Sequence, residues 1–294
     1  MAEKITWAFF GTSRFSTIVL DEMKARGYIP SLIITTEDKP KGRKLILTPP
    51  DVKVWAEREG VPYIQPESLR ETKNPKILEE IKSYSSENFD VFVVASYGKL
   101  LPDSILNIPT HKTLNVHPSL LPRLRGASPI QSAILTENET GVTIIRLDSD
   151  MDHGPILAQE KSEIPEWPPY ADDLETTLGV AGGQMLAGLL PDWVAGKIAE
   201  VEQDHSHATF CKKIEKIDAL LDLTENGETN LRKIRAYHVW PGAFFYYTHG
   251  ENTLRIIVKR AHMENGELVL DRVIPEGKKE MNYADFLNGK IKDK

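Results

Sequence analysis

Short apolar runs alternate with amphipathic segments through the first two thirds of the chain. The pattern predicts buried strands over residues 5–10, 31–35, 89–96 and 113–117. It predicts helices over residues 15–26, 52–60, 75–83 and 172–190. Strands and helices that alternate in this way favour an α/β fold with a doubly wound, mostly parallel sheet. In such a sheet, ligands bind beyond the carboxyl ends of the strands.

Two of these helices carry boundary or packing signals. Asn74 is a candidate N-cap for the helix over 75–83, with Pro75 at its first position. The helix over 172–190 contains no proline in that range. Its glycines, Gly179, Gly182 and Gly183, predict close packing against a neighbouring element.

The pattern changes after about residue 208. Residues 216–223 and 229–237 predict a turn and a short helix, and residues 239–247, 253–259 and 267–274 predict short strands separated by Gly and Asn. Such strands are typical of a small β-barrel or sandwich. The sequence therefore predicts a catalytic domain over residues 1–190, a linker over 191–207 and a C-terminal β-barrel domain over 208–294.

Composition narrows the class of protein. The 294 residues are 40% hydrophobic and 27% charged, as in ordinary soluble globular proteins. No apolar run approaches the roughly 18 residues of a membrane helix, and no leader peptide is visible. Cys211 is the only cysteine, which excludes an internal disulfide. We therefore expect a cytoplasmic protein without membrane association, and the net charge of −7 does not by itself indicate nucleic-acid binding.

The candidate chemistry lies around residues 113–157. Asn115 and His117 stand at i and i+2 of a predicted strand and so face the same side. A loop rich in Pro and Gly follows them, and Asp152 lies in a Gly-Pro turn further on. Amide and imidazolium groups can stabilise an oxyanion. A carboxylate beside them favours the charged imidazole and can accept a proton. The three groups therefore suit acyl transfer without a protein nucleophile.

Other interpretations of these residues are weaker. Asn115 and His117 could merely satisfy main-chain groups at a strand end. His111, His117, Asp152 and His153 could bind a metal, but their spacing matches no known metal motif, and no metal is expected. The motif of serine hydrolases, G-x-S-x-G, is absent. The turn after Gly11 lacks the G-x-G-x-x-G spacing of dinucleotide sites.

Residues 115–130 and 151–157 together resemble the signature of folate-dependent formyltransferases, whose Asn, His and Asp match Asn115, His117 and Asp152. The resemblance implies 10-formyltetrahydrofolate as formyl donor. It also implies a folate pocket formed by the loops after two strands and by the segment before Asp152. The implied folate-binding residues are Tyr97, Gly98, Leu100, Leu101, Ser119, Leu120, Leu121, Pro122 and Asp148. For the leucines, a place in the protein core is the alternative.

Within that family the chain resembles the methionyl-tRNA formyltransferases. The resemblance rests on the basic loop over residues 36–50 and on residues 208–214, 234–242 and 275–281. It implies methionyl initiator tRNA as acceptor and a role in translation initiation. A monomer is expected, although the sequence does not establish the oligomeric state. The implied contacts to this substrate are Phe15, Lys41, Arg43 and Lys44. For Phe15 a core position is the alternative, and for the basic loop an ordinary solvated surface.

The C-terminal domain is expected to bind tRNA, although it is shorter than usual in the family between Tyr247 and Leu268. A basic face is predicted there from Lys212, Lys213, Lys216, Arg232, Lys233 and Arg235. Three other functions stay open: an N-formyltransferase for an amino sugar, a 10-formyltetrahydrofolate hydrolase, and a non-catalytic RNA-binding protein. The basic loop and the C-terminal domain favour tRNA over a sugar, and the complete Asn, His and Asp set disfavours a non-catalytic role.

Overall fold

The structure is a computed structural model, and it describes residues 5–42 and 45–292. The chain forms two compact units, each assembled from several segments. The first contains Met1–Gly126, Thr140–Ser162 and Glu175–Phe210, and the second contains Ala127–Glu139, Glu163–Leu174 and Cys211–Lys294. In this described part of the chain, no helix is both long and apolar enough to cross a membrane.

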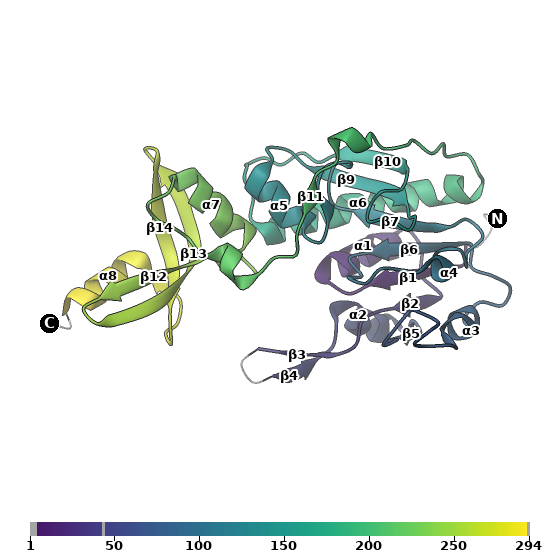
Figure 1. Cartoon of the computed structure of the whole chain (residues 1–294), viewed down its shortest axis with the longest axis horizontal. Coiled ribbons are helices and arrows are strands. Elements are labelled where there is room, and N and C mark those ends of the chain that lie inside the picture. The colour runs from purple at the N-terminus through teal and green to yellow at the C-terminus, as the bar shows by residue number, and fades with distance from the viewer. Residues whose placement is uncertain (1–4, 43–44, 293–294) are drawn as a thin grey trace. The chain divides into compact units, whose positions relative to one another are not determined.

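Among the described residues, the first unit is built on a seven-stranded sheet of order β10-β9-β7-β6-β1-β2-β5 (Figure 1). The strands are β1 (Trp7–Gly11), β2 (Leu32–Ile34), β5 (Tyr63–Ile64), β6 (Val91–Ala95), β7 (Thr113–His117), β9 (Gly141–Arg146) and β10 (Ile156–Lys161). The first five of these are parallel, whereas β9 and β10 each run antiparallel to a neighbour. The predicted, mostly parallel sheet is therefore confirmed.

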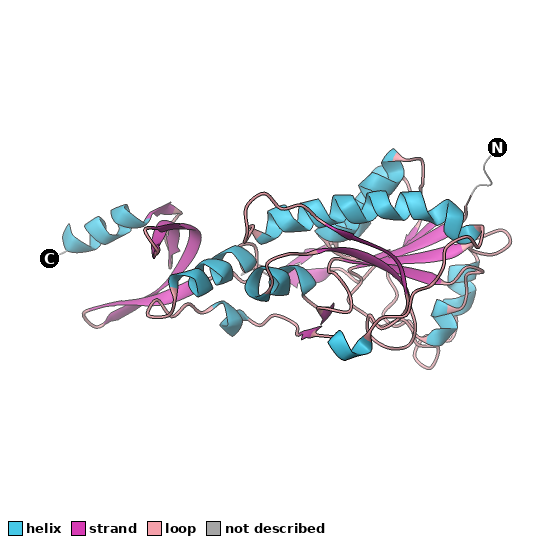
Figure 2. Ribbon diagram, turned by 90° about the horizontal axis from the view of Figure 1, so that it is seen from above, coloured by secondary structure: helices cyan, strands magenta, loops and turns pink. Residues whose placement is uncertain are grey.

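Helices cover both faces of this sheet (Figure 2). The helices of the first unit are α1 (Arg14–Ala25), α2 (Asp51–Glu59), α3 (Ile77–Lys82), α4 (Asp103–Leu106) and most of α6 (Ala171–Val194). A Cβ atom at Gly182 of α6 would lie 2.6 Å from Val116 Cγ1 of β7, so the predicted close packing of this glycine is confirmed. On the opposite face, Ile77 of α3 and Ile105 of α4 join Phe10 and Phe92 in one buried cluster.

Two predicted helix boundaries were wrong. Helix α3 begins at Ile77 after an N-cap at Lys76, two residues later than the Asn74-Pro75 signal indicated. Helix α6 continues through Pro191 to Val194. The indole of Trp193 donates a hydrogen bond to the main-chain oxygen of His111 (2.7 Å), which anchors the last turn of α6. This tertiary contact stabilises a turn that proline alone would disfavour.

The basic loop over residues 36–50 contains a hairpin that the sequence pattern did not indicate. Its strands are β3 (Lys39–Lys41) and β4 (Ile46–Thr48). Lys53 forms an ion pair with Asp38 (2.9 Å) at the base of the hairpin. Hydrogen bonds from Gln65 and Lys53 lower the pKa of Asp38, so this pair stays charged at neutral pH. The base of the hairpin is thus fixed to the first unit.

The second unit contains an antiparallel sheet of order β12-β13-β14-β15. Its strands are β12 (Phe244–His249), β13 (Asn252–Glu264), β14 (Glu267–Pro275) and β15 (Met281–Asn282), and its helices include α5 (Pro129–Thr136), α7 (Gly227–Ala236) and α8 (Tyr283–Lys292). The predicted change to antiparallel strands, typical of a small barrel, is confirmed. Helix α8 was not predicted. Its Phe286 packs on Tyr247 of β12, with ring centroids 5.1 Å apart.

Helix α7 is held within this unit by hydrogen bonds to α5. The guanidinium of Arg232 donates to the main-chain oxygens of Ile134 (2.9 Å) and Glu137 (2.7 Å). These are carbonyls at the end of α5, which lack partners inside the helix. Arg232 therefore caps α5 as well as belonging to α7. The remaining short elements are β8 (Arg125–Gly126), β11 (Phe210–Cys211) and two 3-10 turns, His205–His207 and Lys216–Ala219.

Candidate active site

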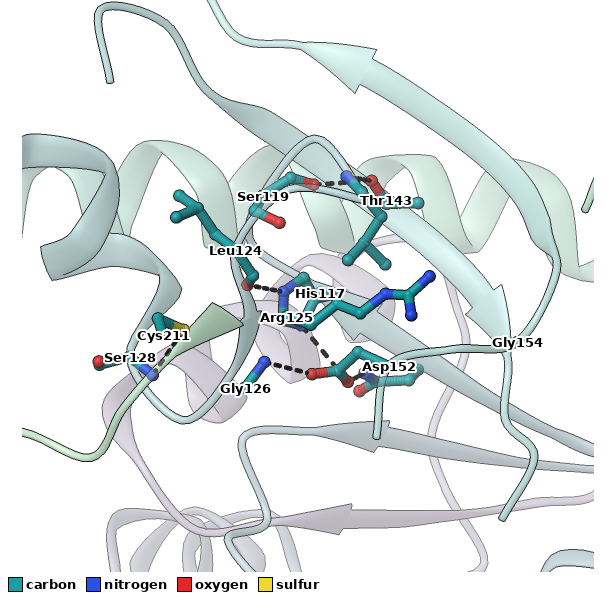
Figure 3. Close-up of polar contacts among 12 residues, drawn as sticks. His117, Ser119, Leu124, Arg125, Gly126, Ser128, Thr143, Asp152, Gly154 and Cys211 are labelled. Carbon is teal, nitrogen blue, oxygen red and sulfur yellow. Dashed lines mark hydrogen bonds and ion pairs between the residues drawn. The ribbon is translucent and has the colours of Figure 1, made fainter. Parts of the chain in front are cut away.

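The candidate site lies at the carboxyl end of β7, between β6 and β9. Asn115 is 8% exposed and pairs in register with Ile145 of β9, and His117 is 4% exposed and pairs with Thr143. The alternation of the strand places both side chains on the same face. Figure 3 shows His117 with the turn that carries Asp152 beside it. In open α/β sheets, ligands bind beyond the carboxyl ends of the parallel strands, and β7 ends there at His117.

Three groups converge on the Asp152 carboxylate. Asn115 Nδ2 donates a hydrogen bond to Asp152 Oδ1 (3.2 Å). The main-chain N–H of Gly126 donates to Asp152 Oδ2 (2.8 Å; Figure 3). His117 Nδ1 lies 3.6 Å from Asp152 Oδ1, which is an electrostatic contact rather than a hydrogen bond. The structure thus brings together the amide, imidazole and carboxylate that the sequence singled out.

The other nitrogen of His117 fixes the orientation of the ring. His117 Nε2 lies 3.0 Å from the main-chain oxygen of Leu124. A carbonyl can only accept, so Nε2 carries a proton and Nδ1 is the nitrogen that faces Asp152. The imidazole therefore presents Nδ1 to the candidate site, an orientation that the sequence could not indicate.

Left-handed backbone conformations mark both segments that hold the site. Asp152 has φ of 49°, and Leu124 has φ of 60°. Such conformations are unfavourable for residues other than glycine, and they persist where surrounding contacts impose them. Their occurrence beside His117 supports a functional role for the pair of segments.

The loop after His117 is fastened to the sheet by Thr143 of β9. The Thr143 hydroxyl donates to the main-chain oxygen of Ser119 (2.7 Å) and accepts from the N–H of Leu121 (3.1 Å; Figure 3). Ser119 uses its own hydroxyl within the loop, where it donates to the Arg123 oxygen (2.6 Å). Ser119 and Leu121 are buried, whereas Leu120 and Pro122 are partly exposed. The loop is thus rigidly placed beside the three site residues.

The predicted folate-binding residues of the loop after β6 differ in how far they are buried. Tyr97 and Leu101 pack in the buried cluster of α3 and α4, next to Leu147, whereas Leu100 is 68% exposed. Burial raises the pKa of the Tyr97 phenol, and its hydroxyl has no hydrogen-bond partner among the described residues. Gly98 has φ of 78°, a left-handed conformation that favours glycine.

Asp148 is already engaged by neighbouring groups. Its carboxylate lies 2.8 Å from His153 Nδ1 and accepts the main-chain N–H of Asp150 (3.0 Å). Leu147 and Asp148 precede Asp152 within the same turn, and Asp148 remains partly exposed. The segment before Asp152 is therefore held in place by its own hydrogen bonds.

Of the predicted tRNA-contacting residues, the structure describes Phe15 and Lys41. Phe15 is 2% exposed in α1, which agrees with the core position left open for it. Lys41 is exposed in β3. Arg43 and Lys44 lie outside the described residues. At the described end of the hairpin, Leu45, Ile46 and Leu47 are exposed.

The predicted basic face of the C-terminal region is smaller than expected. Arg235 is buried and pairs with Glu166 (3.0 Å). Arg232 caps α5, and Lys212 pairs with Asp218 (2.7 Å). Lys233 lies 3.4 Å from Glu225. The predicted basic face is therefore wrong for the buried Arg235, and Lys212, Arg232 and Lys233 have partners within their unit.

Sequence reasoning missed two residues at the site. Gln203 Nε2 donates to the main-chain oxygens of Asp152 (2.9 Å) and Gly154 (2.7 Å). Arg125 donates to Gln203 Oε1 (2.7 Å). Arg125 lies inside the segment over residues 115–130 that resembles the formyltransferase signature, so the sequence could have indicated it. Gln203 lies 51 residues after Asp152 and belongs to no local motif. Among residues 5–42 and 45–292, no group of His, Cys, Asp and Glu is arranged to hold a metal ion.

The sequence of this chain is similar to those of known proteins. The family model described as "Formyl transferase" matches residues 3–186. Methionyl-tRNA formyltransferase of Geobacillus sp. (strain WCH70) is 36% identical over 305 residues, which covers 96% of this chain and 93% of the relative. Methionyl-tRNA formyltransferase of Thermotoga neapolitana is 42% identical over 236 residues, which covers 80% and 73%.

Solved structures show the same fold at lower identity. Methionyl-tRNA formyltransferase from Clostridium thermocellum superposes with a TM-score of 0.60 and 16% identity, covering 92% of this chain and 98% of its own. A sugar N-formyltransferase from Shewanella sp. FDAARGOS_354 gives 0.59 and 17%, covering 94% and 100%. The fold is therefore shared by formyltransferases of different names, and structural likeness alone does not distinguish among them. Because its sequence is 36% identical to the Geobacillus relative over nearly its whole length, the chain belongs to the methionyl-tRNA formyltransferase family.

Proposed function

We propose that this protein transfers a formyl group from 10-formyltetrahydrofolate to the amino group of methionyl initiator tRNA. The observation that carries the chemistry is the convergence of Asn115, His117 and the Gly126 N–H on the Asp152 carboxylate. The acceptor follows from relatives of that name at 36–42% identity. We further propose that the protein acts as a monomer in the cytoplasm during translation initiation. Sedimentation of the purified chain measures its oligomeric state.

The reaction begins when the uncharged amino nitrogen attacks the formyl carbon. The new C–N bond turns the carbonyl oxygen into an oxyanion, and the intermediate collapses as the bond from that carbon to N10 of the folate breaks. The amino nitrogen loses a proton and N10 gains one, so the charges balance. The site must therefore stabilise an oxyanion and move one proton.

The three side chains divide these tasks. Asp152 uses one hydrogen of the Asn115 amide, which leaves the second for the oxyanion. His117 carries a proton on Nε2, so a second proton on Nδ1 makes it a cationic donor toward the same oxygen. The Asp152 carboxylate stabilises that cation and accepts the proton of the attacking amine, directly or through a water. No protein nucleophile is required.

The folate would bind between the two loops that follow β6 and β7. Leu100 and Leu101 would supply apolar contacts, and the main chains at Gly98, at Leu120–Pro122 and before Asp152 would bind the polar edge of the pterin. In support of this, the Tyr97 hydroxyl is a buried donor without a partner among the described residues. Residues 1–190 would then hold both reactants, and residues 208–294 would add affinity for tRNA.

The basic hairpin provides a separate test of the acceptor. Arg43 and Lys44 follow the exposed Lys41 of β3 in the sequence, and a cation there would contact the acceptor end of tRNA. Arg43→Ala is expected to weaken formyl transfer to tRNA at low salt and to leave folate binding unchanged. The difference from wild type should shrink as salt rises, because phosphate contacts are screened. Unaltered transfer at low salt would mean that the hairpin is only a solvated surface.

A panel of acceptors tests the proposed function itself. The protein is incubated with 10-formyltetrahydrofolate labelled in its formyl group and with methionyl initiator tRNA, methionyl elongator tRNA, an amino sugar nucleotide, or water alone. Label should enter the initiator tRNA at the highest rate. Preferential labelling of the sugar, or release of formate without transfer, would assign the site to a sugar formyltransferase or a hydrolase. No turnover of the donor would support a non-catalytic role.

A further inference from the structure

The segment that follows α6 lies along the turn of the catalytic carboxylate. The guanidinium of Arg146 in β9 is bound by Glu200 (2.7 Å). Val201 exchanges two main-chain hydrogen bonds with Ile156 of β10 (2.8 and 2.9 Å). Residues 200–203 are therefore fixed to both strands that flank the turn over residues 147–155. This segment is not a free connector.

The buried side chain of Gln203, in this segment, binds main-chain oxygens of the turn over residues 147–155. Its side chain is 5% exposed. Its amide nitrogen donates to the main-chain oxygen of Asp152 (2.9 Å) and to that of Gly154 (2.7 Å). Both amide hydrogens are thus used on carbonyls at either side of His153. An amide that bridges two carbonyls fixes the distance between them, and so the path of the turn.

Arg125 fixes the orientation of the Gln203 amide. Its Nε and Nη2 atoms donate to Gln203 Oε1 (3.2 and 2.7 Å), and its side chain is 3% exposed. A guanidinium can only donate, so the oxygen of the amide must face Arg125 and its nitrogen must face the turn. A flipped amide would point hydrogens at a cation and oxygen at two carbonyls. Only one arrangement of this network satisfies its partners.

The same network spans both segments that set the Asp152 carboxylate. Arg125 directly precedes Gly126, whose N–H binds Asp152 Oδ2 (2.8 Å; Figure 3). Gln203 holds the main chain of Asp152 itself, where φ is 49°. The left-handed conformation at Asp152 needs such contacts to persist. Through Gln203 and Arg125, the main chain of Asp152 and its hydrogen-bond donor are held at a fixed separation.

We propose that Gln203 is a positioning residue for formyl transfer: its amide, oriented by Arg125, aims the Asp152 carboxylate at His117 and Asn115. Gln203 does not touch the reacting atoms, and its effect on the reaction passes through Asp152. The proposal rests on the catalytic role assigned above to Asp152. It adds a residue from beyond the matched family segment, which ends at residue 186, to the machinery of the site.

The test variant is Gln203→Glu, which keeps the shape of the side chain and its contact with Arg125 but replaces the two donors by an acceptor. The carboxylate would repel the Asp152 and Gly154 oxygens and displace the turn. We expect kcat for methionyl-tRNA to fall about 10- to 100-fold, because small misplacements of a catalytic group cost that much. The KM for the formyl donor should stay near the wild-type value.

Asn107→Asp is the control for the same change of amide to carboxylate on an exposed side chain. The Asn107 amide also donates to a main-chain oxygen, that of Asp103 (2.9 Å), and accepts from a cation, Lys112 (3.0 Å). It lies before β7, at the end of the sheet opposite the site. This variant should keep wild-type kcat. Gln203→Asn keeps the amide but shortens it by one methylene, and its kcat should lie between those of wild type and Gln203→Glu. If Gln203→Glu does not fold, the kcat of Gln203→Asn is compared with that of wild type instead.

A double variant separates positioning from a merely structural role. If Gln203 acts through Asp152, adding Gln203→Glu to Asp152→Ala should lower kcat no further. An equal loss in both backgrounds, or wild-type kcat in Gln203→Glu, would overturn the proposal. Crystal structures of wild type and Gln203→Glu give the Gly126 N to Asp152 Oδ2 distance directly. An unchanged distance would also overturn the proposal. This structural result does not depend on which amine the wild-type enzyme formylates.

Discussion

Asp152→Ala is expected to lower the turnover of formyl transfer at least about 100-fold, the scale of a lost proton acceptor or oxyanion-stabilising group. The variant removes the carboxylate on which Asn115, His117 and Gly126 converge. The fold should survive, because the Asp152 side chain is partly exposed and lies in a turn. Steady-state kinetics with methionyl-tRNA, together with circular dichroism, measure both quantities.

Asn115→Ala and His117→Ala should each cause a loss of similar size. Because the three groups act on the same transition state, the triple variant should be little slower than the slowest single variant. Losses that multiply across the three positions would mean that the residues act independently. Near-normal turnover in His117→Ala would remove the imidazole from the mechanism.

Gly154→Ala is expected to disrupt the site by displacing the main chain of the turn that carries Asp152. A Cβ atom at this position would lie 1.8 Å from the main-chain oxygen of Arg146. That oxygen belongs to β9 and cannot move aside as a flexible side chain would. We expect the free energy of unfolding to fall by roughly 2–3 kcal/mol and kcat to fall at least about 10-fold as the turn shifts. Chemical denaturation and steady-state kinetics measure the two effects.

Gly188→Ala is the control for this glycine. It lies in α6, and a Cβ atom there would meet nothing within 4 Å. Alanine in a helix is favoured over glycine by about 0.5–1 kcal/mol, so this variant should be slightly more stable and fully active. If Gly154→Ala behaves in the same way, the turn is more tolerant than its packing indicates.

The parts of the site that sequence could predict are those that depend on local patterns. The strand over residues 113–117 was predicted with the bounds that the structure has, because its apolar alternation is bracketed by turn residues. That periodicity also placed Asn115 and His117 on one face. The nearness of Asp152 to them was an inference from the resemblance, since 37 residues separate Asn115 from Asp152.

The parts that sequence could not predict depend on contacts between distant segments. Gln203 reaches Asp152 through a pairing of Val201 with Ile156 that no local pattern signals. Helix α6 passes through Pro191 because Trp193 is anchored on His111. The sequence indicates a surface cation at Arg235, yet its side chain is buried, pairs with Glu166 and lies over the ring of Tyr170. In each case tertiary contacts override a local preference.

The central claim is that Asn115, His117 and Asp152 catalyse formyl transfer to methionyl initiator tRNA. Its most direct test is the single-turnover rate of formyl-methionyl-tRNA formation, with enzyme in excess over charged tRNA and saturating 10-formyltetrahydrofolate. Under these conditions product release does not limit the rate. The account predicts rapid formation by wild type and a rate at least about 100-fold lower for the triple alanine variant. No product from wild type, or equal rates for the two proteins, would contradict it.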